Sequence, residues 1–224
     1  MYNLYLVKYA GVDPETGNAL YWKKVDDLDE NGNVIGSHEE KTDVFSEAQN
    51  TNRTPTGNIM PKAYGGFGAT FKFYGFDFSF NCSYQLGGRI LDYSYQDYMS
   101  GGTTAYLGQA WHKDILNSWT AENPNTNVPL IISDTSKPYQ NHTSDRWLTS
   151  SNYLALNNIT LGYTFPQKWI SKLYLSELRI YGAAENVALW SARKGLDPRM
   201  GYVGSDASNY SAKRVISGGV RVSF

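Results

Sequence analysis

Apolar and polar residues alternate strictly over an unusually long stretch of this chain. From Phe76 to Leu86, apolar side chains occupy every second position and polar side chains occupy the positions between them. An average strand of a soluble protein has about five or six residues, whereas a strand that crosses a bilayer at a steep tilt needs roughly 9 to 11. The length of this run therefore favours a membrane-spanning strand.

The same period of two returns in other parts of the chain. Further alternating runs cover 65–74, 153–165, 177–185 and 213–224. Gly75 separates the first of these from the Phe76 strand by a very tight turn, which predicts a hairpin. Two weaker runs, 2–10 and 18–25, flank a turn around Pro14. The pattern predicts about seven strands, and the closing aromatic residue, Phe224, is typical of the last strand of an outer-membrane barrel.

The connections between these runs are of two sizes. Those near Pro14, Gly75 and Gln167 are short, whereas 26–61, 87–151 and 189–212 are long and rich in small polar residues. Outer-membrane barrels sort their connections in this way, into short periplasmic turns and long extracellular loops. We therefore expect an all-β fold, an antiparallel up-and-down transmembrane β-barrel segment with long extracellular loops. In the longest loop, Trp111 and Ile115 stand at helical spacing and predict a short helix over 107–119.

Composition and charge exclude several classes of protein. No run approaches the roughly 18 apolar residues of a membrane helix, while the aromatic fraction of 15%, with 18 Tyr, suits the interfacial girdles of a barrel. The net charge is −1, without a basic stripe for nucleic acid. The single cysteine, Cys82, lies at an apolar position of its strand and is interpreted as a small hydrophobic residue. Residues 1–10 lack the features of a signal peptide, so we expect an export signal upstream.

Seven strands do not close a barrel. A single-chain bacterial barrel has an even number of strands and at least eight of them. We therefore expect this chain to be part of a larger barrel whose other strands lie upstream.

Stretches that resemble one family are spread over most of the chain. They include 10–17, 61–67, 74–79, 119–125, 153–166, 178–186, 195–199 and 219–224. In this order they resemble the C-terminal barrel segment of the SusC/RagA family of TonB-dependent outer-membrane transporters of Bacteroidota. The resemblance implies a 22-stranded barrel, an N-terminal plug, a TonB box and a SusD-like surface lipoprotein as a lid. Residues 1–224 are then the C-terminal part of the receptor barrel, without plug, TonB box or signal peptide.

A barrel assignment divides the strand residues into two faces. Charge is tolerated at bilayer depth only on the side of the lumen. The residues expected to face the lumen are Lys72, Asp77, Asn81, Gln85, Glu177, Arg179, Glu185 and Arg221. Glu177 and Arg179, beside Arg221 on the next strand, are expected to form a cross-strand ladder of charges.

Residues of the long loops are candidates for contact with a substrate or a partner protein. Aromatic side chains stack on sugar rings and anchor interfaces. The candidates are Tyr93, Tyr95, Tyr98, Trp147, Asp197 and Arg199. The alternative for the aromatic residues is packing inside ordered loops.

One segment resembles the first half of a calcium-binding loop. Asp27, Asp29 and Asn31, followed by Gly32, have EF-hand spacing, but His38 occupies the position of the closing carboxylate. A solvated turn is the favoured interpretation, with a calcium site as the alternative.

The chain carries no pattern of a catalytic site. The three histidines are scattered, and no pair of carboxylates is placed for hydrolysis of a glycosidic bond. We expect no enzymatic activity and no cofactor. The chain is predicted to form the barrel wall and loops of an outer-membrane importer of oligosaccharides or peptides. The expected partners are a SusD-like lipoprotein, a glycan or peptide substrate, membrane lipid and, through the plug, TonB. The alternative is a soluble extracellular carbohydrate-binding β-sandwich.

Overall fold

The structure is a computed structural model that describes residues 2–100, 110–131, 140–201, 205–206 and 212–224. The chain divides into two compact units. Residues 60–88, 150–200 and 209–224 form the first, here called the sheet unit, and residues 1–59, 89–149 and 201–208 form the second, here called the loop unit. Each unit is described by itself.

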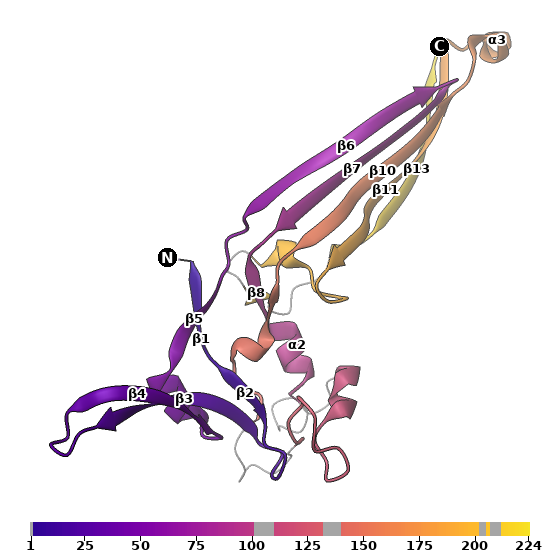
Figure 1. Ribbon diagram of the computed structural model, residues 1–224. Helices are drawn as coiled ribbons and strands as arrows, with labels where there is room; N and C mark the ends of the chain where they lie inside the picture. The colour runs from indigo at the N-terminus through magenta and orange to yellow at the C-terminus, as the bar shows by residue number, and fades with distance from the viewer. Residues whose placement is uncertain (1, 101–109, 132–139, 202–204, 207–211) are drawn as a thin grey trace. The chain divides into compact units, whose positions relative to one another are not determined.

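A single antiparallel sheet of five long strands makes up the sheet unit (Figure 1). The strands are β6 (Ala63–Phe73), β7 (Phe76–Leu86), β10 (Tyr153–Thr164), β11 (Glu177–Ser191) and β13 (Val215–Ser223). Their order in the sheet, β6-β7-β10-β11-β13, follows the order of the chain. This is the up-and-down arrangement that the sequence predicts, and all five strands reach the length needed to cross a bilayer.

Short connections gather at one end of this sheet and long ones at the other. The turn at Tyr74 and Gly75 joins β6 to β7, and a turn with α3 (Gln167–Ile170) and η4 (Ser171–Leu173) joins β10 to β11. Figure 1 shows α3 and the C-terminus at the same end. Gly75 has a φ of 86°, and a Cβ there would lie 2.6 Å from the Thr164 carbonyl oxygen, so the turn requires glycine.

One face of the sheet is apolar along its whole length. The strand register places the following side chains on this face: Phe67, Phe71, Phe73, Phe76, Phe78, Phe80, Cys82, Ile159, Leu161, Tyr163, Ile180, Ile216, Val220 and Val222. Near the turns the aromatic rings touch one another, with Phe76 and Tyr163 4.5 Å apart between ring centres. Phe71 is 58% exposed and Phe73 70% exposed. A β-sandwich would bury such a face against a second sheet, so the rival fold is not the one observed.

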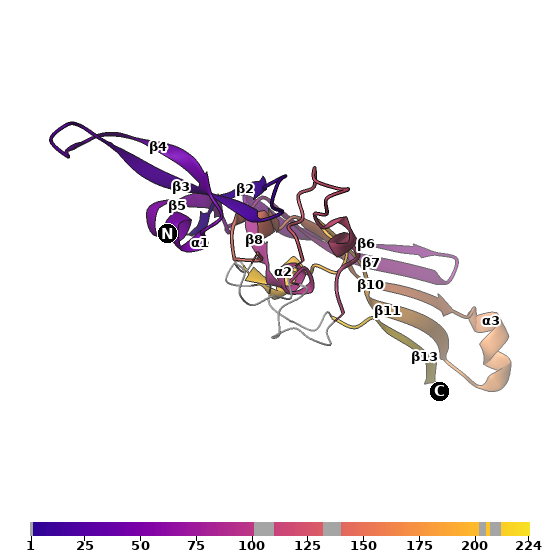
Figure 2. The ribbon, with the colours of Figure 1, turned by 90° about the horizontal axis from the view of Figure 1, so that it is seen from below.

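The loop unit contains smaller sheets and short helices. β1 (Asn3–Val7) pairs with β5 (Arg53–Asn58), and β2 (Tyr9–Val12), β3 (Ala19–Leu28) and β4 (Val34–Thr42) form a three-stranded sheet. β3 and β4 form a long two-stranded hairpin (Figure 2). A further small sheet joins β8 (Arg89–Asp92), β9 (Leu148–Ser150) and β12 (Ser205–Asp206).

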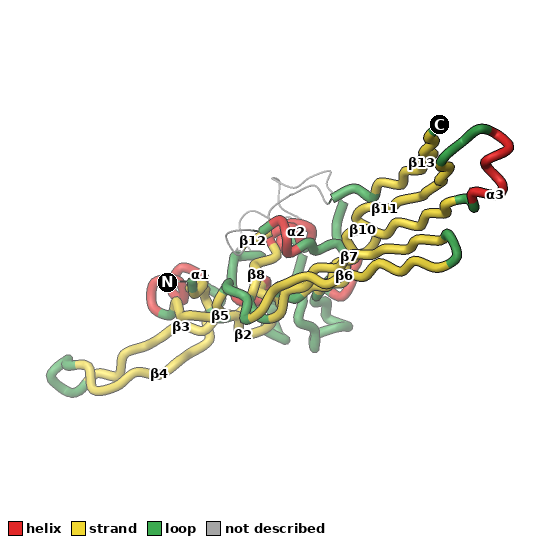
Figure 3. The backbone as a smooth tube through the Cα atoms, turned by 90° about the horizontal axis from the view of Figure 1, so that it is seen from above, coloured by secondary structure: helices red, strands yellow, loops and turns green. Residues whose placement is uncertain are grey.

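The helices of the loop unit are short, as Figure 3 shows in red. They are α1 (Phe45–Thr51), α2 (Tyr93–Tyr98) and the 3₁₀ turns η2 (Lys113–Asn117) and η3 (Asp145–Trp147). Two buried clusters hold the unit together, one around Leu6, Leu91 and Trp147, the other around Val7 and Tyr21.

Two predictions are corrected by the structure. The N-terminal runs do form a hairpin around Pro14, but they belong to the loop unit, so within the described residues the long sheet has five strands and not about seven. The reason is that 23–28 carries charge on both of its faces, which leaves no apolar band for lipid. The helix expected over 107–119 is only the 3₁₀ turn η2, with Ile115 buried; residues 107–109 lie outside the described part of the chain.

Trp119 packs against the N-terminal hairpin instead of extending that helix. Its indole nitrogen donates to the Pro14 carbonyl oxygen at 3.0 Å. A Cβ on Gly17 would lie 2.6 Å from the Trp119 ring, so the ring lies close against the backbone of the turn. No helix among the described residues is long and apolar enough to cross a membrane.

The two faces of the sheet predict opposite responses to a charge. Ile159 lies in the apolar band and Asn158, its neighbour on β10, on the opposite face. In the intact receptor, Ile159→Arg should destabilise the folded barrel by roughly 2–4 kcal/mol because a guanidinium then faces hydrocarbon. Asn158→Arg is the matched control and should have little effect. Unfolding in urea, followed as loss of heat-modifiable mobility on semi-native gels, measures both; equal effects would contradict the assignment of the faces.

Candidate functional site

The polar face of the long sheet carries every residue that the sequence predicts to face the lumen. Asp77 pairs with Lys72 on one side and with Gly162 on the other, and Glu185 pairs with Asn158. The register places all eight predicted residues on this one face: Lys72, Asp77, Asn81, Gln85, Glu177, Arg179, Glu185 and Arg221.

A two-pronged ion pair crosses this face. The Arg179 guanidinium donates to both carboxylate oxygens of Asp77, with Nε 3.0 Å from Oδ1. Asp77 is on β7 and Arg179 is on β11, so the pair passes over β10. It passes at Gly162, where a Cβ would lie 2.5 Å from the guanidinium and 2.6 Å from the carboxylate. Glycine at this position lets two strands that are not neighbours make contact.

Tyr181 extends this polar cluster toward β13. The Arg179 guanidinium lies 5.2 Å from the centre of the Tyr181 ring, and a Cβ on Gly219 would lie 2.6 Å from that ring. Of the expected ladder, Glu177 and Arg221 lie 3.8 Å apart, while Arg179 pairs with Asp77 instead. Beside the pair is an open hollow of about 520 Å³ that Lys72, Asp77, Glu177 and Arg179 help to line.

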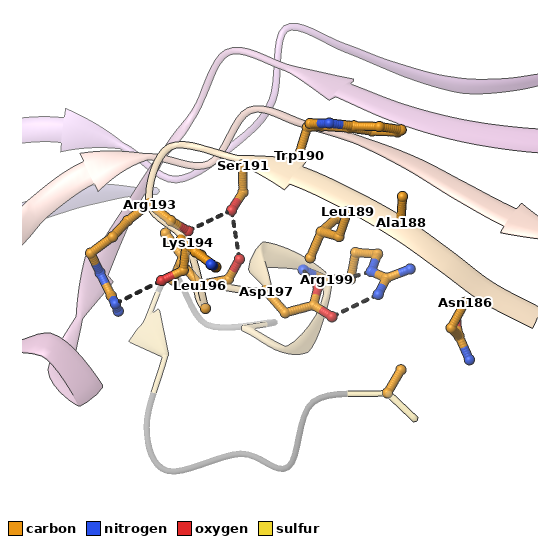
Figure 4. A pocket seen from close by; sticks show the side chains of 12 residues that line it. Asn186, Ala188, Leu189, Trp190, Ser191, Arg193, Lys194, Leu196, Asp197 and Arg199 are labelled. Atoms are coloured by element: carbon orange, nitrogen blue, oxygen red, sulfur yellow. Dashed lines mark hydrogen bonds and ion pairs between the residues drawn. The ribbon is translucent and has the colours of Figure 1, made fainter. Parts of the chain in front are cut away.

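A second hollow, of about 430 Å³, lies at the loop end of β11 (Figure 4). It begins at a register irregularity between β10 and β11: Asn186 has a φ of 50°, and its side-chain amide donates to the Lys213 carbonyl oxygen at 3.0 Å. The segment after β11 folds back beneath the strand. The Ser191 hydroxyl lies within hydrogen-bond distance of two carbonyl oxygens of this segment, those of Arg193 and Leu196.

Asp197 and Arg199 form the polar centre of this hollow, as Figure 4 shows. The Arg199 guanidinium donates to both carboxylate oxygens of Asp197, at 2.8 and 2.7 Å, and the Arg199 backbone N–H donates to Oδ1. This contact raises the pKa of Arg199. Asp197 is buried, so of these two sequence-predicted contact residues only Arg199 offers polar atoms to the hollow. Arg193 and Lys194 add positive charge to its rim.

The aromatic candidates of the loop unit have different surroundings. Tyr98 is 45% exposed, and Tyr93 is half-buried against the Leu91 cluster. The Tyr95 hydroxyl donates to Asp114 at 2.8 Å, and its ring meets Trp147 edge-on. Trp147 is only 2% exposed and donates its indole N–H to the His142 carbonyl oxygen. Its role as a contact residue is therefore corrected: the ring is core, with no surface for a ligand.

Sequence reasoning missed the polar groups around that tryptophan. His142 stacks on Phe45 with ring centres 4.1 Å apart, and burial lowers the pKa of His142. The Asp145 carboxylate accepts the Tyr9 backbone N–H at 2.8 Å, and burial raises the pKa of Asp145. Arg146 lies over the rings of Tyr9 and Trp147. No sequence pattern reveals these contacts, because residues 9 and 146 are brought together only by the fold.

The segment with calcium-loop spacing is the turn of the β3–β4 hairpin. Asp29 accepts hydrogen bonds from the backbone of Asn31 and Asn33 and from the Asn33 amide, which lower the pKa of Asp29. Asp27 instead contacts His38 at 2.7 Å. Within the described ranges no group of three or more His, Cys, Asp or Glu side chains is placed to hold a metal ion. The carboxylates thus serve the turn and the hairpin.

Two TonB-dependent receptors are similar in sequence to this chain. No family model matches the chain. It is 24% identical over 193 residues to the TonB-dependent receptor P3 of Formosa agariphila, a match that covers 81% of this chain and 18% of the relative. It is 26% identical over 173 residues to the TonB-dependent receptor SusC of Bacteroides thetaiotaomicron, covering 77% of this chain and 16% of SusC.

A solved structure of the RagAB peptide transporter shares the fold. The TM-score is 0.75 at 24% identity, and the match covers 99% of this chain and 23% of the matched chain. A structure of the RagAB peptide importer in the closed-closed state gives a TM-score of 0.74. The chain therefore spans about a fifth of the length of the relatives it matches.

The open apolar face, the sorted connections and these relatives point to one class: the long sheet has the fold of an outer-membrane β-barrel segment, and the chain is similar to the TonB-dependent receptors. Within that class it is similar to SusC and shares the fold of the RagAB structures, in line with the SusC/RagA-type segment that the sequence predicts.

Removal of the free space at Gly162 should break the ion pair across β10. In the intact receptor, Gly162→Ala should lower the midpoint of thermal unfolding, because the new Cβ displaces Asp77 from Arg179. In an Arg179→Met background the same change should have a smaller effect, since the pair is already lost. Gly182→Ala on β11 is the matched control, because its Cβ would meet only the Ser217 carbonyl oxygen at 4.0 Å. Equal effects of Gly162→Ala in both backgrounds would show that the contact is not coupled to Gly162.

The lowered pKa of His142 predicts a pH dependence of the loop unit. The unfolded chain, with a histidine pKa of about 6.5, binds this proton more readily than the folded unit does. The stabilisation is therefore complete above the unfolded pKa and is lost as the pH falls through it toward the lower folded pKa. Asp145, whose pKa is raised, acts in the opposite direction.

A comparison of variants isolates the histidine. Hydrogen exchange of residues 140–147 in the intact receptor, corrected for intrinsic rates, should show less protection at pH 5 than at pH 7. His142→Phe keeps the stack on Phe45 and should reduce this loss, whereas His38→Gln on the exposed hairpin should leave it unchanged. The same pH dependence in wild type and His142→Phe would refute the assignment.

Proposed function

We propose that this chain forms part of the wall and the extracellular loops of an outer-membrane nutrient importer. The importer takes up oligosaccharides or peptides together with a SusD-like surface lipoprotein. The observation that carries the proposal is the two-faced sheet, whose apolar face is open and whose short turns and long connections lie at opposite ends. A strand array of this kind suits a lipid boundary on one side and water on the other.

In this proposal the polar face of the sheet lines the lumen. The pair Asp77 and Arg179, with Tyr181 beside it, lies at the end of the sheet near the short turns, which is the periplasmic end. Charged groups at this depth avoid lipid only if they face a water-filled interior. The carboxylate and guanidinium neutralise each other, so the wall here carries polar groups with little net charge.

The loop unit and the hollow at the end of β11 then face the cell exterior. Tyr98, Tyr93 and Tyr95 in the loop unit and Arg199 in the hollow are the proposed contacts with substrate or lipoprotein. All of residues 1–224 belong to the barrel domain of the receptor. The coupling to TonB is assigned to the plug and TonB box of the whole receptor, and the described elements have a transport role rather than a catalytic one.

Uptake by cells tests the proposal. Deletion of the gene for the intact receptor should abolish growth on one class of nutrient, supplied as a panel of oligosaccharides or as a peptide mixture, and the wild-type gene should restore it. The class whose use is lost identifies the substrate. Unchanged growth and uptake on every nutrient in both panels would contradict an importer.

Labelling of intact cells provides the topological control. Lys194 and Lys172 are both exposed and lie at opposite ends of the long sheet. In a Cys82→Ala background, Lys194→Cys should react with a membrane-impermeant maleimide, whereas Lys172→Cys should react only after the cells are opened. The reverse pattern would place the turns outside and overturn the orientation.

A further inference from the structure

Arg146 in the loop unit has an unusual environment for a charged side chain. Its guanidinium carbon lies 5.0 Å from the centre of the Tyr9 ring and 4.5 Å from the centre of the Trp147 ring. Arg146 is partly buried, and the loss of hydration lowers its pKa, while the hydroxyls of Tyr9, Tyr21 and Tyr95 act in the opposite direction. The guanidinium therefore lies over two aromatic rings, in a group of three phenols.

This guanidinium makes no hydrogen bond or ion pair with any residue in the described part of the chain. Its two half-buried counterparts in the sheet unit behave differently. Arg179 holds both oxygens of Asp77, and Arg199 holds both oxygens of Asp197. A guanidinium has five N–H donors, and buried charges in proteins are normally paired.

The nearby carboxylates are engaged with other donors. Asp145 Oδ1 accepts the Tyr9 backbone N–H at 2.8 Å, and Asp114 Oδ2 accepts the Tyr95 hydroxyl at 2.8 Å. A second polar group in the same segment also lacks a partner: the Ser144 hydroxyl is buried and makes no hydrogen bond within the described residues. Residues 144–146 thus contain two polar groups that find no hydrogen-bond partner among the described residues.

We propose that Arg146 anchors a binding site for a carboxylate group of the imported ligand. The planar fork of a guanidinium matches a carboxylate with two parallel hydrogen bonds, and contact with two aromatic rings restricts the orientations of the fork. Only part of Arg146 is accessible, which suits a small group on a flexible ligand better than the broad surface of a folded partner. Tyr9 and Tyr95 supply aromatic surface beside it for the rest of the ligand.

This site rests on the proposed import function and specifies its substrate class as acidic. Two classes of ligand could carry this carboxylate: an oligosaccharide that contains a uronic acid, or a peptide that contains an acidic residue. The probes are therefore tetragalacturonate and tetraglutamate, with maltotetraose and tetraglutamine as uncharged counterparts. Binding of each to the intact receptor in detergent is measured by isothermal titration calorimetry.

At least one acidic probe should bind to the wild-type receptor more tightly than its uncharged counterpart. Arg146→Met should weaken that binding roughly 10- to 100-fold, because a charge-assisted contact is lost. Arg146→Lys keeps the charge without the fork and should give an intermediate loss. Lys41→Gln is the matched control: Lys41 also lies over an aromatic ring in the loop unit, 5.4 Å from the centre of Trp22, and its loss should not change binding.

The outcomes identify the source of the carboxylate. They also distinguish failure of the Arg146 site from failure of the proposed import function. Binding of tetragalacturonate alone identifies an acidic glycan, and binding of tetraglutamate alone identifies an acidic peptide. Equal affinities for charged and uncharged probes, or equal losses in Arg146→Met and Lys41→Gln, would overturn the site. If Arg146→Met lowers the midpoint of thermal unfolding of the receptor, its weaker binding could reflect a less stable fold. The test then rests on Arg146→Lys, which must weaken binding of the acidic probe while the unfolding midpoint stays unchanged. A receptor that imports nutrient without dependence on Arg146 refutes this site alone, whereas one that binds acidic probes but imports nothing refutes import alone.

Discussion

Pairing of backbone amides between strands is the constraint on which the sheet unit depends. Inside a bilayer no water is available for an unpaired N–H or C=O group, so each strand must be matched along its length by a neighbour. A slip of one residue in that pairing would exchange the two faces of a strand. With the observed register, Ile159 faces the apolar side and Asn158 the polar side, and the same choice holds across β6, β7, β10, β11 and β13.

The polar face uses that register for contacts between strands that are not neighbours. Asp77 and Arg179 meet across β10 because Gly162 has no side chain, and Tyr181 lies close to Gly219 for the same reason. Exposed ion pairs contribute little to stability. The two-pronged geometry, however, joins β7 to β11 across β10 on the polar face of the sheet.

The loop unit is stabilised in a different way, by hydrophobic clusters of its own. Trp147 is the centre of one, and the rings of Tyr9 and Tyr21 belong to the other. Packing of this kind makes long connections into ordered structure. It also explains why aromatic residues of the loops cannot all be binding residues: the same side chains are needed inside. Tyr98 lies outside both clusters, and its side chain is exposed.

The sequence by itself determined the long strands, their two faces and the sorting of turns from loops, since alternation and chain length are local properties that every fold must respect. It did not place the N-terminal hairpin outside the long sheet, nor reveal the burial of Trp147. Only the tertiary structure decided that Arg179 takes Asp77 as its partner and that Arg146 lies over the ring of Tyr9. The physical reason is that Arg179 and Asp77 are 102 positions apart in the chain and Arg146 and Tyr9 are 137 apart, and no local pattern specifies which distant side chains the fold brings together.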